Sequence, residues 1–200
     1  MSLFKTDDIR DYAAPAVEQA GAVTVALLER VLMGKRNDKV GELFTELIHD
    51  SLTSYVSAGL WSMHDLLFRI LELTGPARVT FATWSMTQEP VTMLVNALHE
   101  GLILELNGLL DVRVKVRNPK VYQFAKMQFG KVRESVCHAK VTVIENDRWA
   151  VTINGSPNFT NNPRIEAGDV IVSRAIAEFH RTWIMKEIEK AHPFDDEPNT

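Results

Sequence analysis

Residues 137–166 read CHAKVTVIENDRWAVTINGSPNFTNNPRIE and contain two apolar, β-branched segments joined by a short polar turn. We expect strands over 136–144 and 148–155, with a tight turn at Glu145-Asn146-Asp147. A connection this short allows the second strand to run only antiparallel to the first. The segment therefore predicts a β-hairpin within a larger sheet.

The sequence on both sides of this hairpin alternates between strand and helix patterns. Further strands are expected over 77–84, 109–116 and 169–173, where β-branched and apolar residues dominate. Apolar residues at three- and four-residue spacing predict helices over 62–73, 89–100, 119–130 and 174–192. This alternation is typical of an α/β sandwich with a mixed β-sheet flanked by helices.

The first 54 residues have a helical pattern. Val40, Leu43, Phe44 and Leu47 share one helical face, and an Ala/Val/Leu-rich stretch precedes them. We expect an α-helical N-terminal extension over 1–54, a main α/β domain over 55–191 and an acidic tail over 192–200.

Composition narrows the class of protein. Basic residues number 22 and acidic residues 26, so the net charge of −4 excludes a chain that is basic over its whole surface. We find no apolar run of the roughly 18–20 residues that a membrane span needs and no secretory signal pattern, so we expect a cytoplasmic protein with no membrane partner. Cys137 is the only cysteine, which excludes an internal disulfide and a Cys-rich zinc site.

His138 and Lys140 are the first candidate site residues. They are two positions apart on an expected strand, so their side chains leave the same face. Burying two cationic groups together costs several kcal/mol each unless an anion pairs with them, so His138 and Lys140 are unsuited to a hydrophobic core. It is well suited to a phosphate, because Lys supplies fixed charge and His can attack or transfer a proton near neutral pH.

The loop after the second strand supplies further candidates. Gly155 would let a ligand approach the backbone, and Ser156 and Asn158 add neutral hydrogen-bonding groups. Glu166, at the end of the loop, could hold one ring nitrogen of His138 and fix its tautomer.

Together these residues resemble the signature of the phospholipase D superfamily. The match consists of His138-x-Lys140, an acidic residue at Glu145, and Gly155-Ser156-x-Asn158, with Glu166 trailing. The resemblance extends more loosely over residues 60–185 and implies a phospholipase D-like catalytic domain. Glu145 stands where the family carries Asp, and the gap from it to Gly155 is longer than usual, so we expect a structural role for Glu145 near the site.

The motif occurs once, whereas the family builds one active site from two copies. The chain is thus similar to the small bacterial nucleases of the superfamily, and the resemblance implies a homodimer whose motifs meet at the symmetry axis. It also implies a mechanism without metal or cofactor. His138 would form a phosphohistidine, with Lys140, Asn158 and Glu166 as the other catalytic residues and Gly155 and Ser156 as substrate contacts.

A basic segment leads into the expected site. Residues 113–140 hold eight Lys or Arg against Glu134, a net charge of +7 that leaves −11 on the rest of the chain. This favours nucleic acid, DNA or RNA, as the substrate of a phosphodiesterase. Two alternatives remain open at this point: a catalytically silent protein that binds nucleic acid or a protein partner, and a phospholipase or phosphatidyl transferase.

Overall fold

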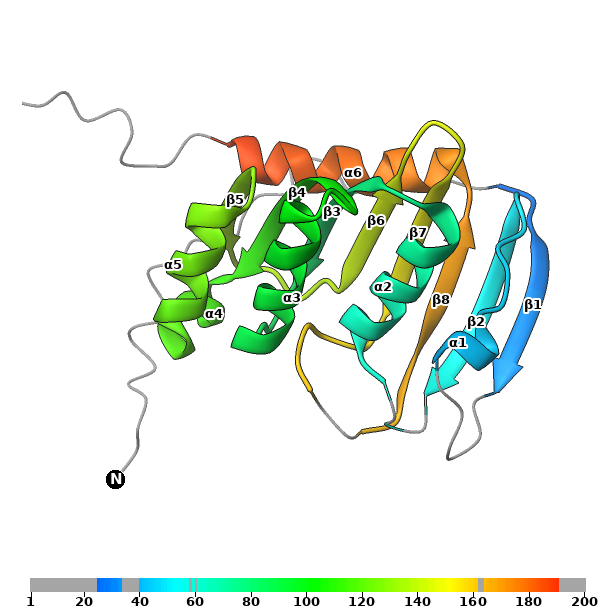
Figure 1. Ribbon diagram of the computed structural model, residues 1–200, viewed down its shortest axis with the longest axis horizontal. Helices are drawn as coiled ribbons and strands as arrows, with labels where there is room; N and C mark the ends of the chain where they lie inside the picture. The colour runs from blue at the N-terminus through cyan, green and yellow to red at the C-terminus, as the bar shows by residue number, and fades with distance from the viewer. Residues whose placement is uncertain (1–24, 34–39, 58, 60, 162–163, 191–200) are drawn as a thin grey trace, which may run out of the picture.

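One eight-stranded mixed β-sheet organises the part of the chain that the structure describes, and helices cover both of its faces (Figure 1). This computed structural model describes residues 25–33, 40–57, 59, 61–161 and 164–190. The strands are β1 (Leu28–Met33), β2 (Ser51–Ser57), β3 (Ala77–Thr83), β4 (Ile103–Asp111), β5 (Lys131–Ser135), β6 (Val141–Glu145), β7 (Ala150–Gly155) and β8 (Glu166–Val172). The helices are α1 (Val40–Leu43), α2 (Met63–Thr74), α3 (Gln88–His99), α4 (Val112–Arg117), α5 (Pro119–Gln128) and α6 (Arg174–Glu189). The prediction of a mixed sheet flanked by helices is confirmed.

The strand order is β1-β2-β8-β7-β6-β3-β4-β5. β3, β4 and β5 run parallel, as do β1 and β2, and the pairings between these two groups through β8, β7 and β6 are antiparallel. The expected hairpin is the β6–β7 pair. Asn146 closes its turn, because its Oδ1 accepts hydrogen bonds from the backbone N–H groups of Arg148 (3.0 Å) and Trp149 (2.8 Å).

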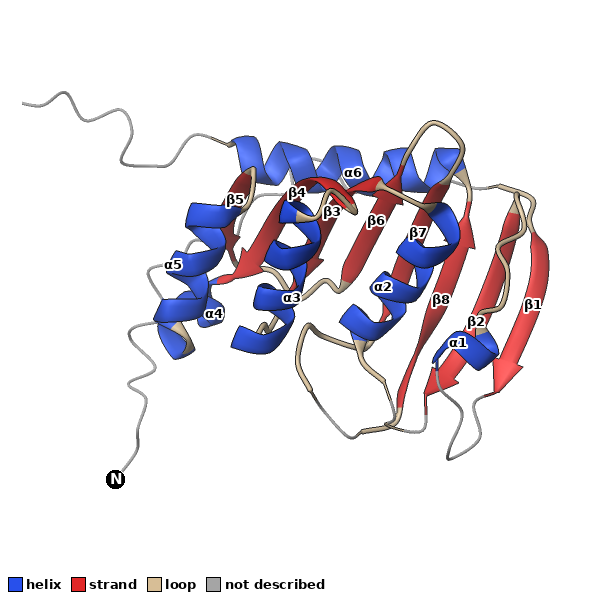
Figure 2. Cartoon of the chain, in the orientation of Figure 1, coloured by secondary structure: helices blue, strands red, loops and turns tan. Residues whose placement is uncertain are grey.

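Helices lie on both faces of the sheet (Figure 2), and an apolar layer lies between the sheet and the helices on each face. Side chains of α2, α3 and α5 pack on one face against alternate residues of the strands, such as Val79 and Phe81 of β3. α6 runs across the other face, where Ile184 meets Ala82 of β3 and Val143 of β6. The period of two along a strand sends neighbouring residues to different layers, which explains why most central strand positions are buried.

Capping residues and helical periodicity correctly predict several of the helices. α2 begins after Ser62, whose side chain and backbone pair reciprocally with the N3 residue Asp65, as a capping box requires. It ends at Gly75, whose φ of 74° lies in the left-handed region that favours glycine. α3 and α6 also occupy the expected segments.

The predicted helical extension is wrong for the residues that the structure describes. Residues 28–33 form β1 and residues 51–57 form β2, and both extend the sheet; α1 alone is helical within the described residues of 1–54. β2 alternates buried and more exposed residues and pairs with β8, more than a hundred residues away, so a long-range partner decides its conformation. Residues 1–24, 34–39 and the predicted acidic tail lie outside the described residues.

Two further differences occur around residues 109–141. The expected strand over 109–116 is the end of β4 followed by α4, because the Asp111 side chain accepts a hydrogen bond from the Arg113 N–H and caps a helix there. β5 was not expected. β6 begins at Val141, so residues 136–140 form an irregular segment that leads into the strand.

Candidate active site

Most candidate residues lie together along the edge of the sheet that is formed by strand ends, where β3, β4 and β7 end and β6 and β8 begin. This is the edge from which the long β7–β8 connection leaves the sheet (Figure 1). The antiparallel order β8-β7-β6-β3 brings the start of β6 beside the ends of both β7 and β3. Topology thus collects side chains that are far apart in the sequence.

His138 and Lys140 lie side by side just before β6. The Lys140 Nζ is 3.4 Å from the Nδ1 of His138 and donates a hydrogen bond of 3.0 Å to the His138 carbonyl. The Gly155 N–H donates to the Lys140 carbonyl (3.3 Å), which ties this segment to the end of β7. His138 is exposed and Lys140 is half-buried. Both are therefore held by backbone contacts while their ends remain open to a ligand.

Burial lowers the pKa of the Lys140 ammonium. The negative charges of the Glu166 and Asp111 carboxylates act in the opposite direction and support the protonated form. Glu166 is thus close enough to Lys140 to influence it electrostatically, although it comes from a different strand.

Asn158 is placed by the end of β3. Its Oδ1 accepts hydrogen bonds from the Ser85 N–H (3.2 Å) and the Thr83 hydroxyl (3.4 Å). This fixes the side-chain orientation, because the backbone N–H requires the oxygen of the amide. The amide Nδ2 is the part of Asn158 that remains for a ligand, since none of the hydrogen bonds among the described residues uses it.

Glu166 is positioned by Ser156, not by His138. The Ser156 hydroxyl donates to Glu166 Oε2 and accepts a hydrogen bond from the Ala167 N–H (3.1 Å). Among the described residues no hydrogen bond joins Glu166 to His138. The expected orienting contact to the imidazole is therefore not formed within this chain.

Gly155 has a structural role in the sheet. A Cβ at this position would lie 2.6 Å from the Ala167 carbonyl oxygen and 2.8 Å from the Gly168 Cα. Gly155 and Gly168 are directly paired across β7 and β8. The absence of a side chain lets these two strands approach closely, and the contact of Gly155 with a substrate stays a prediction.

Glu145 lies away from these residues. It ends β6, and its Oε2 is 3.1 Å from the Nε of Arg181 on α6. Five residues of extended strand separate it from Lys140, about 16 Å. Its role is an ion pair between the sheet and α6, at the far end of the strand from the site.

Trp84 also belongs to the site. The sequence alone predicts only that Trp84 lies at the end of the strand over 77–84. Its ring lies 5.3 Å from that of His138, measured between centroids. Three cations lie over it: Arg113 at 5.1 Å, Arg117 at 5.9 Å and Lys140 at 5.7 Å from the centroid. Each such contact stabilises an exposed cation by about 0.5–1 kcal/mol. The signal in the sequence for these arginines is their spacing of four residues, which places both on one face of a helix; it goes unnoticed when residues 109–116 are expected to form a strand.

Asp111 joins α4 to the segment that carries His138. One carboxylate oxygen accepts from the Arg113 N–H (3.0 Å), and the other accepts from the Cys137 N–H (3.0 Å). Asp111 is buried, and both oxygens are occupied by backbone donors. Its charge lies 3.8 Å from the Arg113 Nε, so Arg113 has one weak ion pair.

The local charge of the site is therefore positive. Neither Lys140 nor Arg117 forms an ion pair with any of the described residues, and the carboxylates of Asp111 and Glu166 already accept backbone or hydroxyl hydrogen bonds. Within the described residues there is also no group of three His, Cys, Asp or Glu side chains that could hold a metal ion. The arrangement is chemically suited to bind an anion next to an imidazole.

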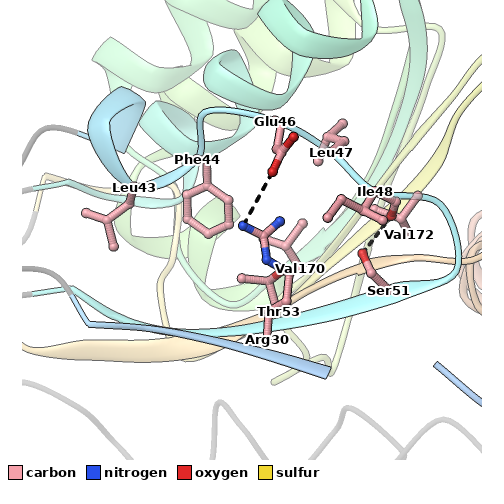
Figure 3. A pocket seen from close by; sticks show the side chains of 10 residues that line it. All are labelled: Arg30, Leu43, Phe44, Glu46, Leu47, Ile48, Ser51, Thr53, Val170 and Val172. Carbon is pink, nitrogen blue, oxygen red and sulfur yellow. Dashed lines mark hydrogen bonds and ion pairs between the residues drawn. The ribbon is translucent and has the colours of Figure 1, made fainter. Parts of the chain in front are cut away.

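A separate hollow lies on the other side of the molecule from α5, between β2, β8 and the segment after α1 (Figure 3). Arg30 and Glu46 face each other across it at 3.9 Å. The other residues that line it are Leu43, Phe44, Leu47, Ile48, Ser51, Thr53, Val170 and Val172. None of the candidate catalytic residues takes part in it.

Comparison with known proteins finds similarity among solved structures only. No family model matches the chain, and no curated protein sequence matches it. Among solved structures the chain is similar to polyphosphate kinase from Porphyromonas gingivalis, with 12% identity and a TM-score of 0.47. The match covers 72% of this chain and 26% of the kinase chain, so this chain spans about a quarter of that protein.

In the described part of the chain, no helix is long and apolar enough to span a membrane. Fold and site together define a mixed α/β protein with a cationic, histidine-containing site at one edge of its sheet.

Proposed function

We propose that this protein is a metal-independent phosphodiesterase, a nuclease that hydrolyses nucleic-acid phosphodiester bonds through a phosphohistidine. The observation that carries the proposal is the proximity of His138 and Lys140, 3.4 Å apart and open to solvent, at the edge where Asn158 and Glu166 also lie. The resemblance of H-x-K and G-S-x-N to the phospholipase D signature supports the same chemistry. The reducing cytoplasm is the compartment we propose for it.

His138 is the nucleophile. We assign Nε2 to the attack on phosphorus, which requires the ring proton to be on Nδ1; the Lys140 ammonium beside Nδ1 can only donate, so a carboxylate must hold that proton. The P–N bond forms as the P–O bond to the leaving alcohol breaks, and a second imidazole donates a proton to the leaving oxygen. That imidazole then takes a proton from water, whose oxygen attacks phosphorus and breaks the P–N bond. Lys140 and the Asn158 amide bind the non-bridging oxygens, where negative charge increases in the transition state.

The second imidazole comes from a second copy of the chain. One copy of the chain carries one H-x-K motif. The leaving oxygen departs on the face of phosphorus opposite His138, so the acid that protonates it must lie on that face. We therefore propose a homodimer in which the partner's His138 is this acid. Glu166, which is not bonded to the imidazole of its own chain, is the carboxylate available to orient it.

Cleavage of labelled DNA and RNA, single- and double-stranded, in excess chelator tests the activity. We expect wild type and the His99→Ala control, which changes an exposed histidine at the end of α3, to cut, and His138→Ala to lose at least about 1,000-fold. Loss of all activity on adding chelator would contradict the proposed mechanism. A folded wild type that binds DNA without cutting it would indicate the silent binding protein, and cleavage of a phosphatidylcholine analogue alone would indicate the lipid enzyme.

Subunit mixing tests the shared site. After exchange with an equal amount of His138→Ala, random pairing leaves about half of the wild-type activity, since mixed dimers lack one imidazole. Mixing with His99→Ala is the control and leaves activity undiminished. Activity that is unaffected by His138→Ala would show that each chain works alone.

A further inference from the structure

We propose that Arg113 and Arg117, held against Trp84, form a second phosphate-binding subsite beside His138, so that the substrate carries successive phosphates along one strand. This inference rests on the proposed function and adds to it a site for a second phosphate of the same strand. The site would bind the reacting phosphate at Lys140 and a neighbouring phosphate at the two arginines.

The two arginines are placed by α4. They are four residues apart and therefore share one face of the helix, which points them at the same tryptophan, 5.1 Å and 5.9 Å from its centroid. Lys115 lies between them in sequence and points elsewhere, where its Nζ is 2.6 Å from Glu134. The helix thus directs Lys115 toward Glu134 and the Tyr122 ring, and directs the two arginines toward Trp84.

The arginines are available to a ligand. Both are exposed, Arg117 has no ion pair among the described residues, and the Arg113 Nε is 3.8 Å from a carboxylate that already accepts two backbone hydrogen bonds. A planar guanidinium presents several donors in the geometry that phosphate oxygens accept. Both side chains can therefore bind an anion without breaking a strong ion pair.

Trp84 connects this subsite with the reaction centre. Lys140 lies over the same ring at 5.7 Å and is in hydrogen-bond reach of His138, so the ring is shared between the two groups of cations. Three like charges around one ring repel each other, and the ring compensates for part of that repulsion. A polyanion would remove the rest of it, and each bound phosphate would displace counterions from the nucleic acid.

The substrate class follows from the number of phosphates that these cations can bind. A diester with one phosphate, such as a phospholipid headgroup or a dinucleotide, has no second phosphate for the arginines when its own lies at Lys140. A longer strand, which carries one phosphate per nucleotide, can occupy both. We therefore infer a preference for oligonucleotides over substrates with a single phosphodiester.

The test compares substrates across variants. Arg113→Gln/Arg117→Gln is expected to lower kcat/KM for a ten-nucleotide strand about tenfold or more and to leave bis(p-nitrophenyl) phosphate within about twofold. The slope of log affinity against log salt should become shallower by about 2, one for each phosphate contact. Lys120→Gln/Lys126→Gln is the matched control, since it removes two exposed charges of the same basic segment from α5.

Trp84 is tested as a positioning residue. We expect Trp84→Leu to reduce the preference for the long strand and Trp84→Phe, which keeps an aromatic face, to restore most of it. Equal losses on both substrates, or a strand preference unchanged in the arginine variant, would overturn the subsite. If wild type cuts neither substrate, the proposed function fails, and strand binding to the same variants by fluorescence anisotropy still decides whether the arginines bind phosphate.

Discussion

The two ends of the β6 region carry charged residues in contrasting environments. At the far end, Glu145 pairs with Arg181, and the Asn146 side chain makes four hydrogen bonds, two within the turn and two to carbonyls at and just after the end of α2. At the near end, Lys140 and His138 lie beside Trp84 and two arginines, and the nearby carboxylates are bonded to backbone or hydroxyl groups. One end satisfies its polar groups internally, whereas the other leaves cations for a ligand.

Residues that stabilise the fold therefore lie at one end of the β6 region, and the residues of the candidate active site lie at the other. Changes at the far end should affect stability and leave chemistry intact. Changes at the near end should affect anion binding, except where a residue also holds the backbone. The following predictions address each case.

Asp111→Ala should have the largest effect on stability. It removes the cap of α4 and leaves the buried Cys137 N–H without its acceptor. Together these losses should lower the free energy of unfolding by about 2–4 kcal/mol. Urea denaturation measures this, and cleavage should fall as well because the segment before His138 loses its anchor.

Asp147→Ala is the control for that experiment, since it alters an exposed carboxylate at the far turn. It should change stability by less than about 0.5 kcal/mol. Equal effects of the two substitutions would contradict the assigned role of Asp111.

Asn146→Ala should destabilise the protein without affecting chemistry. The side chain accepts from two N–H groups of its own turn and donates to the carbonyls of Thr74 and Pro76, both at 3.1 Å. We expect a loss of about 1–3 kcal/mol in the free energy of unfolding. Cleavage rates measured below the unfolding transition should equal those of wild type, and a lower kcat would show that the two ends are coupled.

Glu134 makes stability depend on acid pH at the site end. Burial alone would raise its pKa, but hydrogen bonds from Lys115 and Tyr122 outweigh this and lower it from 4.5 to about 2. A depressed pKa in the folded state stabilises the protein above pH 4.5, and this contribution is lost as the pH falls toward 2. Thermal unfolding of Glu134→Gln should therefore differ most from wild type near neutral pH, and the two should converge near pH 2. A difference that does not change with pH would contradict the ion pair.

Glu145→Gln should have the smallest effect. The Arg181 side chain is 44% exposed, so solvent screens the pair, and we expect it to contribute at most about 1 kcal/mol. Neither kcat nor KM should change. A fall in kcat of tenfold or more would show that Glu145 acts on the chemistry from the far end of β6.

Sequence reasoning located the parts of the molecule whose cause is local. The capping pair of Ser62 and Asp65, the β6–β7 hairpin and the proximity of His138 to Lys140 all follow from short-range spacing. β1 and β2 were mistaken for helix because a strand far along the chain, β8, determines the conformation of β2. VRVKV after Asp111 alternates as a strand would, but the Asp111 cap makes it a helix.

The charged part of the site could not be predicted for a related reason. Trp84 and the arginines are about thirty residues apart in sequence and meet only because β3 and β4 are neighbours. The partners of Glu166 and Gly155 likewise depend on how β7 pairs with β8. Composition indicated a basic segment, but only the fold shows which of its charges face the histidine.

The central claim is that hydrolysis proceeds through a covalent bond to His138, and stereochemistry at phosphorus tests it most directly. An oligonucleotide with one chiral phosphorothioate linkage would be cleaved in oxygen-18 water and the configuration of the product determined. Attack by His138 and then by water gives two displacements, each of which inverts phosphorus, so the account predicts overall retention. Inversion would mean that water attacks the substrate directly, and it would contradict the phosphohistidine mechanism.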